Sequence, residues 1–210
     1  MSNESTRNAA DTLAKIISLV FHPLFMPLYG LGILFSSPTS LGYVPFQVKK
    51  IMFLIVLMNN VLVPLALLPF FRHRNIISSY SIEERSERIL PLVTGSVLYI
   101  ITTFIFLRFP VPEFFKSFIF AGAIIVVVLT IINFRWKISI HGASAGAITA
   151  LVIVLALKSN ATLTFYLVSV ITAGGLILTS RLRLNSHNPC QVWIGFLTGL
   201  TISGLSLWFL

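Results

Sequence analysis

The sequence predicts an all-α protein, a polytopic bundle of six to seven transmembrane helices that forms one integral membrane domain over residues 1–210. Three observations lead to this fold class. Hydrophobic residues make up 56% of the chain and charged residues only 10%, whereas a soluble domain carries about 25% charged residues. The apolar residues gather in runs of spanning length, and most cations lie between these runs. Backbone groups in hydrocarbon must be hydrogen-bonded internally, so such runs are expected to be helices.

Seven apolar runs have about the 20-residue length that a membrane span requires. They cover residues 16–35, 51–71, 89–107, 118–134, 142–157, 161–179 and 192–210. The fifth run is short, and it can extend into the preceding segment KISIH. Proline lacks a backbone N–H and its ring clashes with the preceding turn. Pro23 and Pro27 in the first run and Pro64 in the second are therefore expected to kink or interrupt those helices.

The formal charge of +9 does not indicate a nucleic-acid partner, because the cations are scattered in short loops and form no basic groove. Such cations set topology or hold the anionic head groups of membrane lipids. The single cysteine, Cys190, excludes an intramolecular disulfide. The N-terminal residues lack the pattern of a cleaved secretory signal, so we expect the first span to be retained. The oligomeric state is left open.

Seven crossings place polar segments that are distant in sequence on one side of the membrane. We call the side that holds the N-terminus the near face. It also receives the segments 72–88, 135–141 and 180–191, with three of the four histidines, His73, His141 and His187. The near face holds ten of the 15 Lys and Arg residues, which favours a cytoplasmic position for it. Without the four cations assigned to the candidate site the counts are six and five, so both orientations stay open.

Two near-face segments carry the chemistry of phosphate binding. Arg181 lies six residues before His187. A guanidinium binds phosphate oxygens through paired hydrogen bonds, and a neutral imidazole can attack phosphorus. Lys137, Ser139 and His141 precede the fifth span, where the free N–H groups of a helix start favour an anion.

A third near-face pattern is the pair Arg85 and Arg88, at positions i and i+3, which one helical turn would place on one face. Other residues are assigned structural roles. His22 lies inside the first run. Gly195 and Gly199 are spaced so that two helices can approach closely, and we expect them to pack within the bundle.

These motifs resemble the type 2 phosphatidic acid phosphatase superfamily of membrane lipid phosphatases, which is related to the vanadium haloperoxidases. The third motif of that family reads S-R, five residues, H, three residues, D. This chain has Ser180, Arg181 and His187 in those places, and Gln191 where the Asp falls. The second motif, P-S-G-H, is matched by the Ser and His of 138–141.

The first motif of the family reads K, six residues, R-P. Arg85, Arg88 and Pro91 approach this pattern at tighter spacing, and Ser81 stands where the Lys falls. The resemblance covers residues 80–210, the expected phosphatase-like core, and residues 1–79 form the N-terminal spans. It implies a divergent bacterial branch of the family, located in the inner (cytoplasmic) membrane.

The resemblance also implies a role for each site residue. His187 would be the nucleophile that forms a phosphohistidine, and His141 the acid that protonates the leaving alkoxide. Phosphate oxygens would be bound by Arg181, Lys137, Ser139, Arg85 and Arg88. Gln191 would orient the nucleophile. No metal or cofactor is expected, and the only Asp in the chain is Asp11, so no aspartate-rich magnesium motif exists.

The implied function is hydrolysis of a phosphate monoester or diphosphate on a lipid, with phosphatidate, phosphatidylglycerol phosphate or a polyprenyl diphosphate as substrate and membrane lipids as surroundings. Gln191 leaves two alternatives open, because a Gln accepts a hydrogen bond but supplies no charge to the imidazole. The chain is either a slower phosphatase or a catalytically silent lipid-phosphate binder or transporter. Glu84 or Glu87 of the first motif could supply the missing carboxylate. A structural membrane protein without a site is the third possibility.

Overall fold

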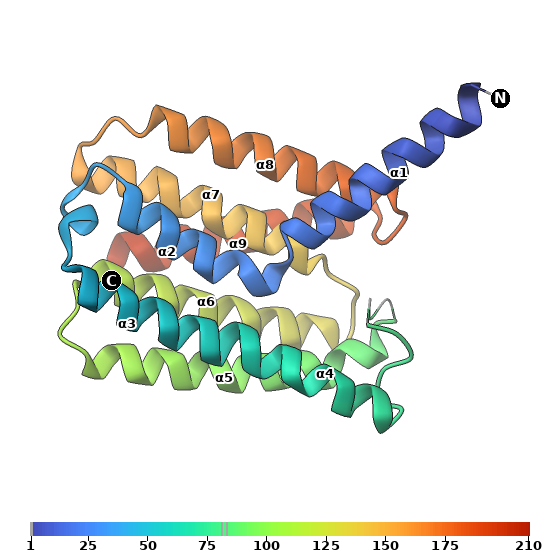
Figure 1. The fold of residues 1–210 in the computed structure, drawn as a ribbon, viewed down its shortest axis with the longest axis horizontal. Helices are drawn as coiled ribbons and strands as arrows, with labels where there is room; N and C mark the ends of the chain where they lie inside the picture. The colour runs from blue at the N-terminus through green and yellow to red at the C-terminus, as the bar shows by residue number, and fades with distance from the viewer. Residues whose placement is uncertain (1, 81, 83) are drawn as a thin grey trace.

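The computed structural model describes the backbone of residues 2–80, 82 and 84–210, and the side chains from residue 8 onward within these ranges. Ser81, at the Lys position of the first motif, lies outside the described residues. The regular structure of the described part is helical, and it contains seven segments that are long and apolar enough to cross a membrane. The predicted all-α class is confirmed for the described residues, and the seven helical segments of spanning length agree with the predicted six to seven spans. Figure 1 shows these segments lying side by side in a bundle.

The first span is two helices joined by a break. α1 (Ser2–Val20) ends before the short 3-10 helix η1 (Pro23–Phe25), and α2 (Met26–Ser36) completes the crossing. His22 has an extended backbone with φ −65° and ψ 138°, as a residue before proline prefers. The interruption predicted at Pro23 is confirmed. The predicted start at residue 16 is wrong, because the amphipathic N-terminal segment continues the helix well beyond the apolar run.

The second span also changes its winding inside the membrane. α3 (Phe46–Val56) passes into the π-helical segment η3 (Leu57–Leu62), which leads into α4 (Val63–His73). The ring of Pro64 would clash with the carbonyl of Asn60, four residues earlier, in a continuous α-helix. A wider π turn accommodates this clash. The bend predicted at Pro64 is therefore confirmed, in the form of a π segment.

The remaining five spans are single helices that cross in alternating directions (Figure 1). They are α5 (Ile89–Arg108), preceded by the 3-10 turn η4 (Ser86–Arg88), then α6 (Glu113–Asn133), α7 (Ile140–Ser159), α8 (Thr164–Arg183) and α9 (Pro189–Phe209). The expected extension of the fifth span toward KISIH is confirmed, since α7 begins at Ile140. The loops after α4, α6 and α8 lie at the end of the bundle from which α1 enters.

α7 is the central helix of the bundle, with 61% of its span buried. It packs most closely on α9, because glycines remove side chains where the two backbones meet. A Cβ on Gly142 would lie 2.6 Å from the carbonyl oxygen of Val192. A Cβ on Gly195 or Gly199 would collide with the backbone of Ser139 or Ala143. The two α9 glycines therefore pack inside the bundle, as predicted.

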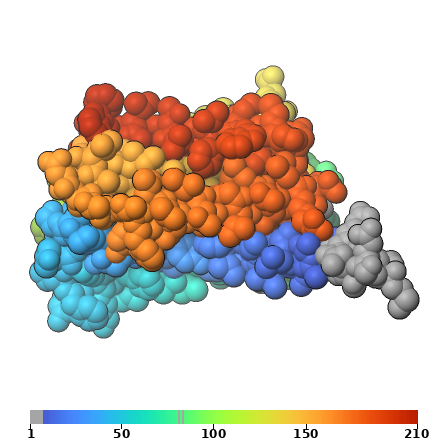
Figure 2. Space-filling model, turned by 90° about the horizontal axis from the view of Figure 1, so that it is seen from above, coloured from blue at the N-terminus to red at the C-terminus, as the bar shows by residue number. Residues whose placement is uncertain are grey.

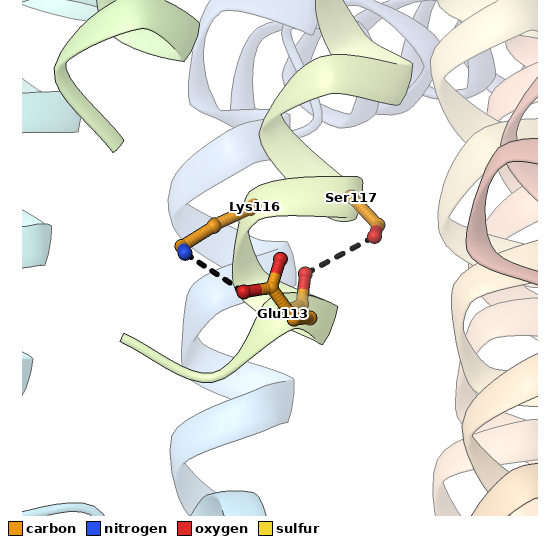
Figure 3. A network of polar contacts seen from close by, with 3 residues as sticks. All are labelled: Glu113, Lys116 and Ser117. Carbon is orange, nitrogen blue, oxygen red and sulfur yellow. Dashed lines mark hydrogen bonds and ion pairs between the residues drawn. The ribbon is translucent and has the colours of Figure 1, made fainter. Parts of the chain in front are cut away.

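In the space-filling view of Figure 2, α8 lies alongside α1 on the outer side of the bundle. At the opposite end from the near face, the first turn of α6 is held by its own side chains (Figure 3). Lys116 forms an ion pair of 2.8 Å with Glu113, and the Ser117 hydroxyl donates to the Glu113 carbonyl oxygen at 3.1 Å. This network lies within the first turns of α6, away from the near-face motifs.

Candidate functional site

A cavity of about 210 Å³ opens among six of the spans and extends inward from the near face. Basic and imidazole groups line its near-face end, namely Arg88, Arg181, His141, His187 and His22. Apolar side chains line the rest, with Pro64 and Leu68 on α4 and Leu92 and Leu98 on α5 among them. The cavity is therefore amphipathic, with a cationic end and an apolar depth.

The position and the tautomer of His187 are set by the start of α9. Asn188 and Gln191 form a capping box, in which the Asn188 side chain accepts from the Gln191 N–H at 2.9 Å and Gln191 Oε1 accepts from the Asn188 N–H at 3.3 Å. This fixes the amide orientation of Gln191. His187 Nδ1 lies 3.0 Å from the same Oε1, so Nδ1 carries the hydrogen and donates it. The lone pair of His187 is then on Nε2.

Arg88 lies beside that lone pair. Its Nη1 is 3.5 Å from His187 Nε2, and its Nε donates to the carbonyl oxygen of Ile82 at 2.9 Å. The pKa of His187 is lowered to about 4, first by burial and then by the Arg88 guanidinium, while the hydrogen bond to Gln191 opposes the shift. At neutral pH the imidazole is therefore uncharged, and its Nε2 can act as a nucleophile.

His141 enters the cavity from the first turn of α7. Its Nε2 lies 3.1 Å from the carbonyl oxygen of Ser18 on α1, so Nε2 is the donor and Nδ1 is the nitrogen that exchanges a proton. Ser139 is buried and is the N-cap of α7, where its hydroxyl accepts from the Gly142 N–H at 3.1 Å. The structure thus gives Ser139 a capping role that fixes the start of the helix bearing His141.

Two of the predicted phosphate ligands lie close to the histidines. Arg181, in the last turn of α8, lines the cavity with His141 and His187. Lys137 is half-buried in the loop before α7, and its charge contributes to the lowered pKa of His187. Together with Arg88 they bring positive charge to the same end of the cavity, which is an environment suited to a dianionic phosphate.

Arg85 does not share that environment. Its Nη1 donates to the carbonyl oxygens of Asn133 at 2.9 Å and Phe134 at 2.5 Å, at the end of α6, and Asn133 Nδ2 donates back to the Arg85 carbonyl at 3.1 Å. A 3-10 turn joins the two arginines, closed by the Arg88 N–H and the Arg85 carbonyl oxygen at 3.2 Å, and such a turn keeps residues i and i+3 on one face. Their long side chains nevertheless reach different partners. The structure uses Arg85 to hold the end of α6.

The partner of the His187 imidazole is Gln191, and neither Glu84 nor Glu87 takes this place. Within the described residues, no group of three or more His, Cys, Asp or Glu is arranged to hold a metal ion. The charge of a bound phosphate would be balanced by the basic side chains.

The sequence did not indicate two residues that line the cavity. His22, at the break in the first span, stands edge-on against His141 with ring centroids 5.4 Å apart. Asn60, in the π segment of the second span, is 1% exposed and also lines the cavity. Polar residues inside a span are costly and frequently functional, and this was the available signal for both.

Comparison with models of known protein families, with curated proteins and with solved structures finds no match for this chain. The function is therefore inferred from the geometry of the cavity and from the chemistry of the groups that line it.

Proposed function

We propose that this protein is a membrane-embedded lipid phosphatase, which hydrolyses a phosphate monoester or diphosphate of a lipid through a phosphohistidine on His187. The observation that carries the proposal is the orientation of His187. Gln191 holds its Nδ1–H, and the Nε2 lone pair lies beside the Arg88 guanidinium in a cavity with an apolar depth. A phosphate bound by the cations would meet a nucleophile, and its lipid chain would enter the apolar part.

The reaction follows from the groups in place. His141 first takes up a proton on Nδ1 from the bound phosphate. Nε2 of His187 attacks phosphorus, the phosphorus–oxygen bond to the lipid breaks, and the leaving alkoxide takes that proton. The neutral His141 then accepts a proton from the water that attacks the phosphohistidine. The phosphorus–nitrogen bond breaks, the departing phosphate takes this proton, and both imidazoles return to their neutral starting states. Arg88 and Arg181 stabilise the charge on the transferred phosphoryl group.

This proposal includes membership of the type 2 phosphatidic acid phosphatase superfamily, with residues 80–210 as the phosphatase-like core, in a bacterial inner membrane. Two relations support it. The residues matched to the third and second motifs, His187 and His141, line one cavity although 46 residues separate them. Arg88, matched to the first motif, lies within 3.5 Å of the proposed nucleophile.

The test is phosphate release by the purified protein from phosphatidate, phosphatidylglycerol phosphate and polyprenyl diphosphate. His187→Asn should reduce turnover by about 10³-fold or more, because the nucleophile is removed. His73→Asn is the matched control, since His73 is an exposed near-face histidine at the end of α4. A phosphoryl group trapped on the protein should be labile in acid, and it should be missing in His187→Asn. Release of phosphate from none of the three lipids would overturn the proposal.

A second candidate is a lipid-phosphate binding or transport protein without turnover. It is favoured by the uncharged partner of His187, because Gln191 cannot stabilise an imidazolium as a carboxylate does. The same variants separate the two functions. In a binder, His187→Asn weakens the affinity for phosphatidate only partly, and the unchanged protein releases no phosphate. In a purely structural protein, neither affinity nor turnover is measurable.

A further inference from the structure

The interruptions in the first and second spans meet inside the bundle. η1 of the first span packs against η3 of the second, and each contributes a polar side chain to the lining of the cavity, His22 and Asn60. Interrupted helices at the middle of a membrane are typical of binding sites, because they present polar groups where a continuous helix presents none. The question is which chemical group these two residues would bind.

The tautomer of His22 is set by the helix that follows it. Nδ1 of His22 accepts the Leu24 N–H at 3.3 Å and thereby caps η1. A neutral imidazole that accepts at Nδ1 carries its hydrogen on Nε2. His22 therefore supplies one uncharged N–H donor, on a ring that lines the cavity next to His141.

Asn60 has a hydrogen-bonding group to spare. Its Oδ1 accepts from the Thr102 hydroxyl at 2.8 Å, whereas its Nδ2 is buried and has no hydrogen-bond partner among the described residues. Leaving a buried donor unpaired is energetically costly, so such a donor at the wall of a cavity indicates an acceptor that arrives with a ligand. The neighbouring Asn59 is fully engaged with α5, through Leu98 and Thr102.

His22 lies at the inner border of the cationic end, beside His141, and Asn60 lies deeper on the second span. α1 enters from the near face, and His22 follows Ser18, the carbonyl partner of His141, by four residues. On the second span, the cavity lining runs from Phe71 near the face to Asn60, which is about 16 Å of helix at 1.5 Å per residue. A phosphate held by the cations would therefore place the lipid portion of the ligand against His22 and Asn60.

We propose that His22 and Asn60 form a subsite for the ester carbonyl oxygens of an acylated glycerophosphate, and that this subsite selects acyl lipids over polyprenyl ones. The inference rests on the proposed function for the placement of the phosphate. Both donors are uncharged, so they suit a neutral oxygen better than a second anion. A polyprenyl chain carries no oxygen beyond its phosphate ester and would leave both donors unpaired, which a polar site strongly disfavours.

The subsite is tested by binding, in a His187→Asn background that cannot form the phosphohistidine. The probes are dioleoyl phosphatidate, its dioleyl ether analogue, which lacks the carbonyls, and a polyprenyl monophosphate. The parent should bind the diester about tenfold more tightly than either of the others, as expected for hydrogen bonds to otherwise unpaired donors. His22→Asn should lose this preference, because Asn can still accept from the Leu24 N–H and cap η1 but does not reach into the cavity. Asn60→Leu should lose it as well.

Two variants serve as controls for folding and position. His22→Gln keeps an N–H near the position of Nε2 and should retain the ester preference. Ser203→Ala removes the hydrogen bond from a buried α9 hydroxyl to the Ala147 carbonyl, away from the cavity lining, and should lower thermal stability without changing the ester preference. Equal binding of diester and diether by the parent, or an unchanged preference in His22→Asn, would overturn the inference. Equal hydrolysis of the diester and the diether by the unchanged protein would also overturn the subsite, while leaving the phosphatase proposal intact. An ester preference without any phosphate release would retain the subsite and overturn the phosphatase.

Discussion

Gln191 accepts two hydrogen bonds with one oxygen, from the Asn188 N–H and from the His187 imidazole. Its neutral carbonyl orients the ring and leaves the positive charge that develops on His187 without a counter-charge. A carboxylate in the same place would supply one, and a charge-assisted hydrogen bond is about twice as strong as a neutral one. The chemistry of the site is thus limited by one amide group.

We expect Gln191→Glu to increase turnover of a lipid phosphate about tenfold. Glu has the same length as Gln, so it can keep both hydrogen bonds, and its charge is favourable at the N-terminus of α9. Phosphate release under saturating substrate measures the effect. Cys190→Glu is the control, because it adds the same charge one residue away, where the side chain is exposed. An equal gain in turnover in both variants would show that added negative charge near the start of α9, and not the hydrogen-bond partner of His187, causes the increase.

The titration of His187 gives a second expectation at this scale. Because its pKa is lowered from 6.5 to about 4, the nucleophile remains neutral through the mildly acidic range, and kcat/KM should fall only as the pH approaches 4. Arg88→Gln removes a cation beside His187, so it should raise the pKa of His187 and shift this acidic fall in kcat/KM to higher pH. Between pH 6.5 and 4 the unfolded chain binds more protons than the folded one, so the contribution of His187 to stability is complete above 6.5 and is lost as the pH falls to 4.

Imidazole nitrogen chemical shifts measured against pH would check the titration directly, since His187 can be assigned by its loss in His187→Asn. A midpoint near 6.5 would contradict the buried environment described for this residue. The lowered pKa of His187 could not be predicted from the sequence, because burial and the Arg88 contact depend on how the loops before α5 and α9 fold toward each other.

At the scale of the elements, the junction between α7 and α9 positions the site. The backbone N–H of Ser139, the N-cap of α7, donates to the Gln191 carbonyl oxygen at 3.2 Å in the first turn of α9. Gly195 and Gly199 keep the two helices in contact below this point. The start of α7 carries His141 and the start of α9 follows His187, so the separation of these helices sets the separation of the two histidines.

We expect Gly199→Val to destabilise the protein by about 1–3 kcal/mol or more, because the added side chain collides with the Ala143 backbone and a helix cannot move aside without strain. Thermal unfolding in detergent measures the change. Gly174→Val in α8 is the matched control, since a Cβ at Gly174 meets nothing within 4 Å. An equal loss of stability in both variants would contradict the close packing of α7 on α9.

The helices themselves were the easiest part to predict, because a bilayer requires long apolar runs and internally bonded backbone. Pro23 and Pro64 also revealed where two helices are interrupted. The sequence could not show that these two interruptions meet, since packing between spans depends on side-chain fit across the bundle. For the same reason His22 was assigned a structural role, and the sequence could not show that the Arg85 side chain reaches the end of α6 while that of Arg88 reaches His187.

At the scale of the whole molecule, seven crossings place the motif segments at one end of the bundle. Cys190 is the only cysteine, it is exposed, and it stands at the near-face start of α9. It is therefore a natural reporter of the side on which the cavity opens. The excess of cations in the near-face segments favours a cytoplasmic location.

We expect a membrane-impermeant maleimide to label Cys190 in inverted vesicles and not in intact cells. Labelling after detergent solubilisation measures the total reactive thiol, and Cys190→Ser shows the background. Labelling in intact cells would place the near face outside and would contradict the topology inferred from the cations. In that case the proposed substrate phosphate would be hydrolysed on the outer side of the membrane.

The capping box at the start of α9 has a consequence for how this protein can vary. Gln191 begins a transmembrane helix and also sets the tautomer of the proposed nucleophile. Any substitution there is subject to selection on folding and on chemistry at the same time. In a saturation library, the tolerated set at this position should be narrower than at the adjacent Cys190, and it should consist of residues whose side-chain oxygen reaches both the Asn188 N–H and the imidazole.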